Sequence, residues 1–163
     1  MDHTGAFELL MRDHAPMIRR IAASYEADRE LAHDLAQEIF IAVWRALPSF
    51  RGESSLRSFV ARIAPNRAVT HVARSAAAPR WVELTGEHLC PQPGLEELAV
   101  ERDREERALA AVQKLPLAYR QVATLLLEGF TAAEVAQALA LTPNAVAIRA
   151  SRARALLRSM LGE

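Results

Sequence analysis

Two short helices joined by a tight turn restrict the fold of this chain more than any other feature. They lie in the segment FTAAEVAQALALTPNAVAIRASRARALL, residues 130–157. Thr131 and Glu134 form the S/T-x-x-E pattern of a capping box at the start of the first helix. After a short turn, Thr142 and Pro143 suit the start of the second helix. The pattern favours a helix-turn-helix, whose second helix enters the major groove of DNA, and a plain helical hairpin is the alternative.

The second of these helices has an apolar side and an exposed side when its residues are placed at about 100° intervals. The side expected to face the core carries Val146, Ala150, Ala153 and Leu157. The opposite side carries Asn144, Ala147, Ile148, Ser151 and Ala155, with Arg152 and Arg158 beside it and Arg149 at the margin of the core. Isoleucine can contact a thymine methyl group, Asn and Ser can hydrogen-bond to base edges, and arginines at the sides suit phosphates.

Composition supports a helical chain, because 51% of the residues are hydrophobic while only 6% are aromatic. No run of residues reaches the roughly 18 to 20 apolar residues that span a bilayer, and the N-terminal segment lacks the apolar core of a signal sequence. The single cysteine, Cys90, excludes an internal disulfide. We therefore expect a cytoplasmic location and no membrane insertion.

The formal net charge of zero is the sum of four segments of alternating sign. Residues 1–44 hold four arginines and eight acids, and residues 45–75 hold six arginines and one glutamate. Residues 76–108 hold four arginines and eight acids, and residues 109–163 hold six basic and three acidic side chains. The basic segments can follow a phosphate backbone while the acidic segments face a different partner. The neutral total therefore does not exclude nucleic acid.

The periodicity predicts an all-α protein of two small helical domains joined by a flexible Pro-rich linker. We expect the first domain at residues 1–75, the linker at 76–95 and the second domain at 96–163. The linker segment AAAPRWVELTGEHLCPQPG contains three prolines and two glycines and has no helical period. In the first domain, Pro16 is expected to bend or divide the first helix, and Asp28 is expected to cap the second.

The second helix, expected to end before Pro48, has two distinct sides. Its predicted core stripe consists of Leu31, Leu35, Ile39, Ala42, Val43 and Ala46. The other side carries Asp34, Gln37, Ile41, Trp44 and Arg45, with Glu38 at the border. Large apolar side chains on a polar face indicate a protein partner, and the alternative is that Trp44 packs beneath the first helix or the linker.

Two segments carry a resemblance to a known family. DLAQEIFIAVWRALPSFRGESSLRSFVARIAPNRAVTHVAR resembles region 2 of the sigma-70 class of bacterial RNA polymerase sigma factors, in particular the small two-domain extracytoplasmic-function (ECF) group. LPLAYRQVATLLLEGFTAAEVAQALALTPNAVAIRASRARALL resembles region 4 of the same group. The two segments cover most of the chain in the order and spacing of that group.

The resemblance implies three binding surfaces. The second helix would dock on the clamp helices of the largest polymerase subunit through Asp34, Gln37, Glu38, Ile41 and Trp44. The third helix, expected to start around Ser55, and the loop before it would open the −10 promoter element. A flipped base would enter a pocket near Asn66, and the residues concerned are Phe50, Arg51, Arg57, Phe59, Arg62, Asn66 and Arg67. The −35 element would be contacted by Thr142, Asn144, Ala147, Ile148, Arg149, Ser151 and Arg152.

The same resemblance implies that the partners are the polymerase core, including the flap of its second-largest subunit, promoter DNA and an anti-sigma factor. His88 and Cys90 do not form a metal-binding pattern, so no metal or other cofactor is expected. No cluster of side chains has catalytic spacing, which argues against an enzyme. A stand-alone helix-turn-helix regulator, and an interaction module that has lost DNA binding, are the alternatives.

Four features depart from the family pattern. Pro65 lies inside the third helix and is expected to kink it, at a cost of about 3 kcal/mol unless the geometry adapts. Thr70 stands where an aspartate is common. Ala140 occupies a turn position usually held by glycine, at a cost of about 1 kcal/mol if positive φ is required. The pair Ala147 and Ile148 replaces a basic residue and a serine, so the base preference at the −35 element should be atypical.

Overall fold

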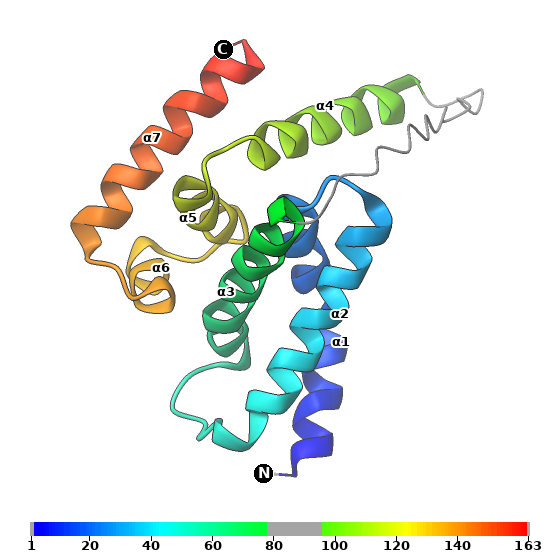
Figure 1. Cartoon of the computed structure of the whole chain (residues 1–163), viewed down its shortest axis with the longest axis vertical. Coiled ribbons are helices and arrows are strands. Elements are labelled where there is room, and N and C mark those ends of the chain that lie inside the picture. Colours follow the sequence, from blue (N-terminus) through cyan, green and yellow to red (C-terminus); the bar gives the residue numbers. More distant parts are fainter. Residues whose placement is uncertain (1, 78–95, 163) are drawn as a thin grey trace.

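The computed structural model describes residues 2–77 and 96–162, and all regular structure within these ranges is helical (Figure 1). The first half comprises α1 (His3–Tyr25), α2 (Arg29–Ala46), the single 3-10 turn η1 (Leu47–Ser49) and α3 (Leu56–Ala77). The second half comprises α4 (Glu96–Gln113), α5 (Leu117–Leu127), α6 (Ala132–Leu139) and α7 (Pro143–Leu161). The prediction of an all-α chain with two helical units is confirmed. Most of the predicted linker lies outside the described residues.

Helix α2 begins where the sequence predicts, because the Asp28 carboxylate accepts hydrogen bonds from the main-chain N–H groups of Glu30 and Leu31 at 2.9 and 3.0 Å. Its core stripe is largely as predicted, and the fully buried members are Leu35, Ile39 and Val43. The prediction for Leu31 is wrong, since 43% of this residue is exposed. Leu31 lies in the first turn of α2, and the stripe becomes covered only from Leu35 onward.

Neither internal proline ends its helix. Helix α1 is continuous through Pro16, so the predicted division of this helix does not occur. Proline removes the hydrogen bond to the carbonyl four residues earlier, and Arg12, which carries that carbonyl, is exposed to water. Helix α3 likewise continues through Pro65 to Ala77, with the proline ring buried. Pro65 therefore packs in the core without interrupting α3.

The helix-turn-helix forms as predicted. Thr131 Oγ1 accepts from the Glu134 N–H at 3.2 Å, and the Glu134 carboxylate accepts from the Thr131 N–H at 2.7 Å, which completes the capping box. Ala140 has a φ of 52°, so this turn does adopt the left-handed conformation that favours glycine. Thr142 Oγ1 then accepts from the Ala145 N–H at 3.1 Å and caps α7. The N-terminal ends of both helices are thus specified by local hydrogen bonds.

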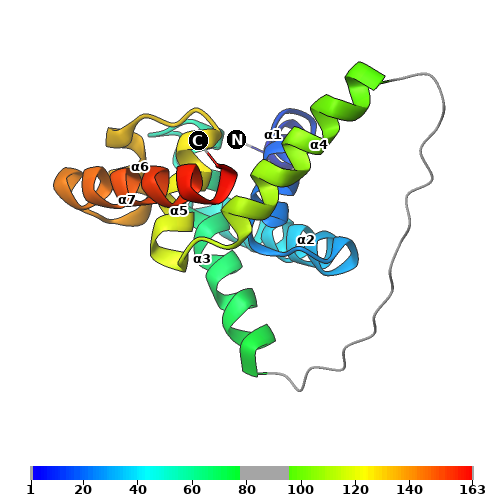
Figure 2. The ribbon, with the colours of Figure 1, turned by 90° about the horizontal axis from the view of Figure 1, so that it is seen from above.

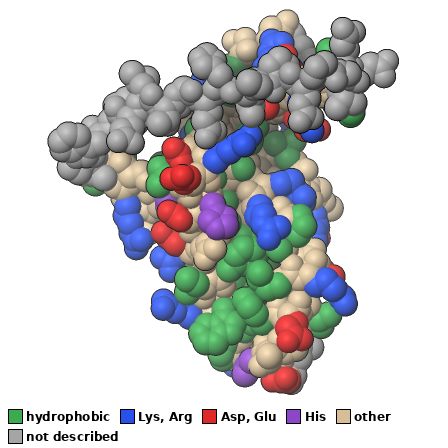
Figure 3. Space-filling view, turned by 90° about the vertical axis from the view of Figure 1, so that its right-hand side faces the viewer, with side chains coloured by type: hydrophobic (Ala, Val, Ile, Leu, Met, Phe, Trp, Pro, Cys, Tyr) green, Lys and Arg blue, Asp and Glu red, His purple; other side chains and the backbone are tan. Residues whose placement is uncertain are grey.

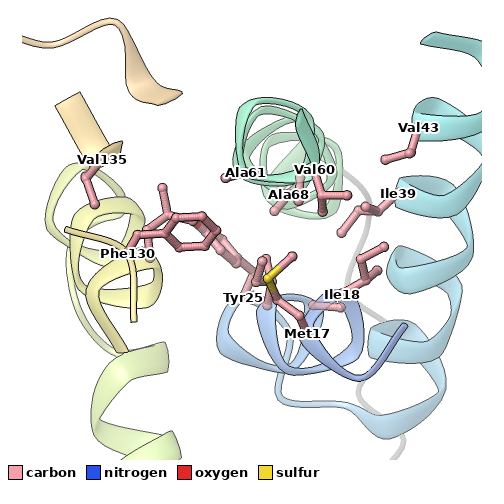
Figure 4. Close-up of a cluster of buried hydrophobic side chains, with 14 of the residues drawn as sticks. Met17, Ile18, Tyr25, Ile39, Val43, Val60, Ala61, Ala68, Phe130 and Val135 are labelled. Atoms are coloured by element: carbon pink, nitrogen blue, oxygen red, sulfur yellow. The ribbon is translucent and has the colours of Figure 1, made fainter. Parts of the chain in front are cut away.

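One hydrophobic cluster extends through both halves of the chain. It contains Ile18 and Ile39 from the first half and Leu125, Val135 and Val146 from the second. Figure 4 shows α3 between these groups, with Ala61 on the side of Phe130 and Val135 and Val60 on the side of Ile39 and Val43. Seen from above, α4 crosses α1, and α7 lies on the outer side of α5 and α6 (Figure 2). The two helical units are therefore packed together, which the sequence pattern did not predict.

Candidate nucleic-acid interface

Helix α7 presents the small exposed face that the helical wheel predicts. Val146, Ala150 and Ala153 are buried against the neighbouring helices. The outward face consists of Asn144, Ala147, Ile148 and Ser151, all exposed, with Ile148 at 43%. Thr142, also exposed, uses its hydroxyl oxygen for the cap, and Arg149 is half-buried at the margin of the core. The structure thus brings the predicted −35 residues together at the start of one helix.

Arginines lie at the sides of this face. Arg152 is exposed, and its Nη1 donates to the hydroxyl oxygen of Tyr119 in α5 at 3.2 Å. Arg158, six residues further along α7, is also exposed. The bond to Tyr119 restricts the rotamers of Arg152 and so lowers the entropy that a phosphate contact costs.

A second group of predicted residues surrounds the connection between α2 and α3. The rings of Phe50 and Phe59 lie 5.0 Å apart at an interplanar angle of 56°, a tilted aromatic pair. The Ser55 hydroxyl accepts from the Ser58 N–H at 3.1 Å, so Ser55 caps α3 close to its expected start. Gly52, with a φ of 75°, supplies the left-handed turn of the loop. Both aromatic rings are only partly buried, which leaves stacking surface beside the loop.

Asn66 is exposed on α3, one position after Pro65. Its side-chain Nδ2 donates to the main-chain oxygen of Arg62 at 3.1 Å. Thr70, at the second departure from the family pattern, donates its hydroxyl to the main-chain oxygen of Asn66 at 3.0 Å. This bond uses one of the two Nδ2 hydrogens, so the second hydrogen and Oδ1 remain available to a base.

The predicted arginines of this region differ in their surroundings. Arg51 and Arg62 are exposed, and Arg67 is half-buried. Arg57 instead reaches the second half of the chain: its Nη2 donates to the main-chain oxygen of Glu128, and its guanidinium lies 3.9 Å above the ring of Phe130. Arg57 is therefore engaged within the protein, which no local pattern indicated.

The outward face of α2 is exposed as predicted. Asp34 and Gln37 point to solvent, and Ile41 and Trp44 are 48% and 56% exposed. Among the described helices none covers Trp44, so it does not pack beneath α1. The alternative that Trp44 packs beneath the linker concerns residues outside the described ranges. Glu38 is half-buried, as its border position predicts, and its Oε1 lies 3.9 Å from Nδ1 of His71.

An apolar hollow extends this face towards α1. It is lined by Phe7, Phe40, Ile41 and Trp44. Figure 3 shows hydrophobic side chains gathered over α1 and α2 on this side of the molecule. The sequence interpretation missed Phe7 and Phe40. A signal was available for Phe40, because it precedes Ile41 and lies one turn before Trp44, outside the predicted core stripe.

No group of three or more His, Cys, Asp or Glu side chains suited to a metal ion occurs within residues 2–77 and 96–162. His88 and Cys90 lie outside the described residues. The helices in these ranges also include none whose length and apolarity would let it cross a membrane.

Comparison with known proteins agrees with this geometry. Residues 10–78 match the family described as Sigma-70 region 2, and residues 105–157 match Sigma-70, region 4. The RNA polymerase sigma-H factor of Pseudomonas aeruginosa is 31% identical over 159 residues, which cover 91% of this chain and 82% of that protein. The ECF RNA polymerase sigma factor SigM of Mycobacterium tuberculosis is 28% identical over 161 residues, which cover 96% of this chain and 78% of that protein.

A solved structure of CnrH in complex with the cytosolic domain of CnrY has 25% identity and a TM-score of 0.68, and covers 98% of this chain and 89% of that chain. The chain belongs to the sigma-70 class of RNA polymerase sigma factors. Within this class it belongs to the extracytoplasmic-function group of two-region proteins.

Proposed function

We propose that this chain binds the RNA polymerase core, directs it to specific promoters and helps to melt the −10 element. One observation carries the proposal: two separate candidate nucleic-acid surfaces, on α3 and α7, coincide with the two matched sigma regions. A stand-alone regulator would need only the helix-turn-helix. The division into residues 1–75, 76–95 and 96–163 is part of this proposal.

The polymerase-docking surface is the outward face of α2. Asp34, Gln37 and Glu38 supply polar groups, and Ile41 and Trp44 supply exposed apolar area. The adjoining hollow adds apolar surface from Phe7 and Phe40 (Figure 3). In protein interfaces, a central aromatic side chain surrounded by polar residues commonly contributes much of the binding energy. We assign the clamp helices of the largest subunit to this face, and the flap of the second-largest subunit to the region 4 half.

The −10 surface comprises the loop before α3 and the exposed side of that helix. Phe50 and Phe59 offer aromatic surface for stacking, and the Asn66 amide can read the edge of a flipped base. The arginines of this surface contact phosphates. They are Arg51, Arg57, Arg62 and Arg67.

The −35 surface is the outward face of α7. Asn144 and Ser151 can hydrogen-bond to base edges, and Ile148 can contact a thymine methyl group. Ala147 offers only a methyl group where a basic side chain is common in the family. The base preference should therefore depend more on apolar contact than in members that carry a basic residue there.

An anti-sigma protein completes the proposed set of partners. The related CnrH is in complex with the cytosolic domain of CnrY, and we extend this relationship to the present chain. The proposed role places the chain in the cytoplasm with the polymerase. There it acts as a non-catalytic, dissociable subunit.

The deciding experiment adds the purified chain to sigma-free core polymerase and measures promoter-dependent transcripts from a library of promoter fragments. The expected result is initiation from a subset of fragments that share two sequence elements. Binding to duplex DNA without any initiation would favour a stand-alone regulator. Polymerase binding without sequence selection would favour an interaction module.

A further inference from the structure

One pair of side chains joins α5 to α7 beside the outward face of α7. Arg152 Nη1 donates to the hydroxyl oxygen of Tyr119 at 3.2 Å, and the two residues are 33 positions apart in the chain. Arg152 is exposed, whereas Tyr119 is half-buried in the first turn of α5. Arg152 follows Ile148 by one turn and therefore lies on the same side of α7. The pair is thus at the edge of the candidate −35 surface.

Apolar packing holds the ring of Tyr119 in place. The ring packs against a small buried cluster that contains Leu115, Ala123 of α5 and Ala153 of α7. Leu115 and Ala153 are 1% and 2% exposed, so the cluster is closed to water. A tyrosine side chain has only two rotatable torsions, and packing of the ring therefore also fixes the hydroxyl. The Tyr119 oxygen is a preplaced acceptor for the guanidinium of Arg152.

Arg152 keeps most of its hydrogen-bonding capacity for a ligand. A guanidinium carries five N–H groups, and the bond to Tyr119 uses one of them. Among the described residues no carboxylate forms an ion pair with Arg152. Helix α7 itself contains four arginines and no acidic residue. The positive charge and the Nε–Nη2 edge of Arg152 can therefore form a two-point contact with a phosphate.

Arg154, two residues further along α7, is held differently. Its Nε donates to the main-chain oxygen of Ala150 at 3.3 Å, so its guanidinium lies against its own helix. Two residues correspond to about 200° around a helix, which places Arg154 on another side of α7. In the part of the chain that the structure describes, Arg152 is the arginine of α7 whose side chain is bonded to a neighbouring helix.

The distance along α7 also suits a phosphate contact. In a helix-turn-helix, the N-terminal residues of the second helix contact base edges. Arg152 follows Asn144 by eight residues, which corresponds to about 12 Å along the helix axis. The major groove is about 12 Å wide. When Asn144 contacts a base, Arg152 is therefore close to the wall of the groove, where the phosphates lie.

We infer that Tyr119 is a positioning residue of the −35 surface, because its hydroxyl directs the Arg152 guanidinium towards a phosphate of the DNA backbone. This role rests on the proposed function and extends the −35 surface from α7 to α5. An arginine that is ordered before binding loses less rotamer entropy when it contacts its ligand. Loss of the Tyr119 hydroxyl should therefore weaken DNA binding, and it should do so only while Arg152 is present.

The test measures binding of the full-length chain, without polymerase, to a fluorescent duplex of mixed sequence and about 30 base pairs. Titrations run from about 20 to 200 mM salt, because phosphate contacts make the affinity depend on salt. Tyr119→Phe keeps the ring and should bind about three- to fivefold more weakly. The slope of log affinity against log salt should stay unchanged, because this substitution alters no charge. Arg152→Ala should weaken binding by about tenfold and reduce that slope by about 1.

The double variant separates positioning from a direct or structural role. Tyr119→Phe combined with Arg152→Ala should bind within about 1.5-fold of Arg152→Ala alone. The matched control is Tyr25→Phe, which removes the same hydroxyl from a residue of α1 that is only 5% exposed. This control should bind the duplex as tightly as the unmodified chain.

The role of Tyr119 is overturned if Tyr119→Phe binds as tightly as Tyr25→Phe. It is also overturned if loss of the hydroxyl weakens binding by the same factor with and without Arg152, or if the unmodified chain does not bind the duplex at the lowest salt concentration. Failure of the proposed function would be seen separately, as absence of promoter-dependent transcripts with core polymerase. The duplex titrations contain no polymerase, so they judge the role of Tyr119 whatever the transcription assay gives.

Discussion

Helices α3 and α7 both carry arginines around a stripe of small buried residues, yet the structure uses their surfaces differently. The outward face of α7 is open, because among the described helices this helix packs on α4, α5 and α6 through its other side (Figure 2). The first turns of α3 lie against α6, and Arg57 is engaged with Glu128 and Phe130. Two surfaces that are both predicted to contact DNA thus differ in access.

The difference shows that tertiary packing decides which of these arginines is accessible to DNA. In the sequence, Arg57 and Arg62 are equivalent members of a basic segment. After folding, Arg62 stays exposed while Arg57 lies under a turn that is 71 residues away along the chain. The following predictions test how far the two halves act together and how far their surfaces act independently.

The largest effect is expected from shortening a buried leucine in either half. Leu35 in α2 and Leu125 in α5 are both fully buried in the shared cluster. Leu35→Ala and Leu125→Ala should each lower the free energy of unfolding by about 2 to 5 kcal/mol. Because the cluster is continuous, each variant should shift one common transition, measured by circular dichroism in urea. Two separate transitions, with only one moved by each variant, would show that the halves unfold independently.

A smaller effect is expected from a substitution on the outward face of α2, which belongs to neither candidate DNA surface. Trp44→Ala should weaken binding to core polymerase by about 2 kcal/mol, or about 30-fold, because it removes an exposed aromatic anchor. Fluorescence titration of labelled core measures the affinity. Leu9→Ala is the matched control, since Leu9 of α1 is 43% exposed and lies outside the proposed docking surface. An equal loss in both variants would contradict a docking surface on α2.

Removing one side-chain amide from each candidate DNA surface should affect the two promoter elements independently. Asn66→Ala should impair opening of the −10 element, and Asn144→Ala should weaken binding at the −35 element, each by about 1 to 3 kcal/mol. Permanganate reactivity of the holoenzyme complex reports opening, and gel-shift titration with duplex fragments reports −35 binding. If Asn66→Ala left opening unchanged, the base pocket would have to lie elsewhere on α3.

The smallest effect concerns the turn that positions α7. Ala140 has a φ of 52°, a conformation that costs a residue with a Cβ about 1 kcal/mol relative to glycine. Ala140→Gly should therefore raise the free energy of unfolding by about 1 kcal/mol, measured by thermal and urea denaturation. DNA affinity should not change, because the residue lies outside the outward face of α7. Destabilisation by this variant would show that the turn carries no strain.

Much of each helix could be predicted because the signals are local. Capping by Asp28, Thr131 and Thr142 depends on residues within one turn, and periodicity indicates which side of a helix is buried. The same reasoning placed Trp44 and Ile148 on outward faces. Leu31 was assigned wrongly, because periodicity says which side it occupies but not where the covering helices begin.

The sequence by itself determined the helices, their caps, the helix-turn-helix and the resemblance to the sigma-70 class, since all of these depend on short-range spacing. Only the tertiary structure decided that one core unites both halves, that Phe7 and Phe40 line a hollow with Trp44, and that Arg20 and Arg57 both contact Glu128. These features depend on contacts between residues far apart in the chain. No periodic pattern within a single helix encodes which distant surface will cover it.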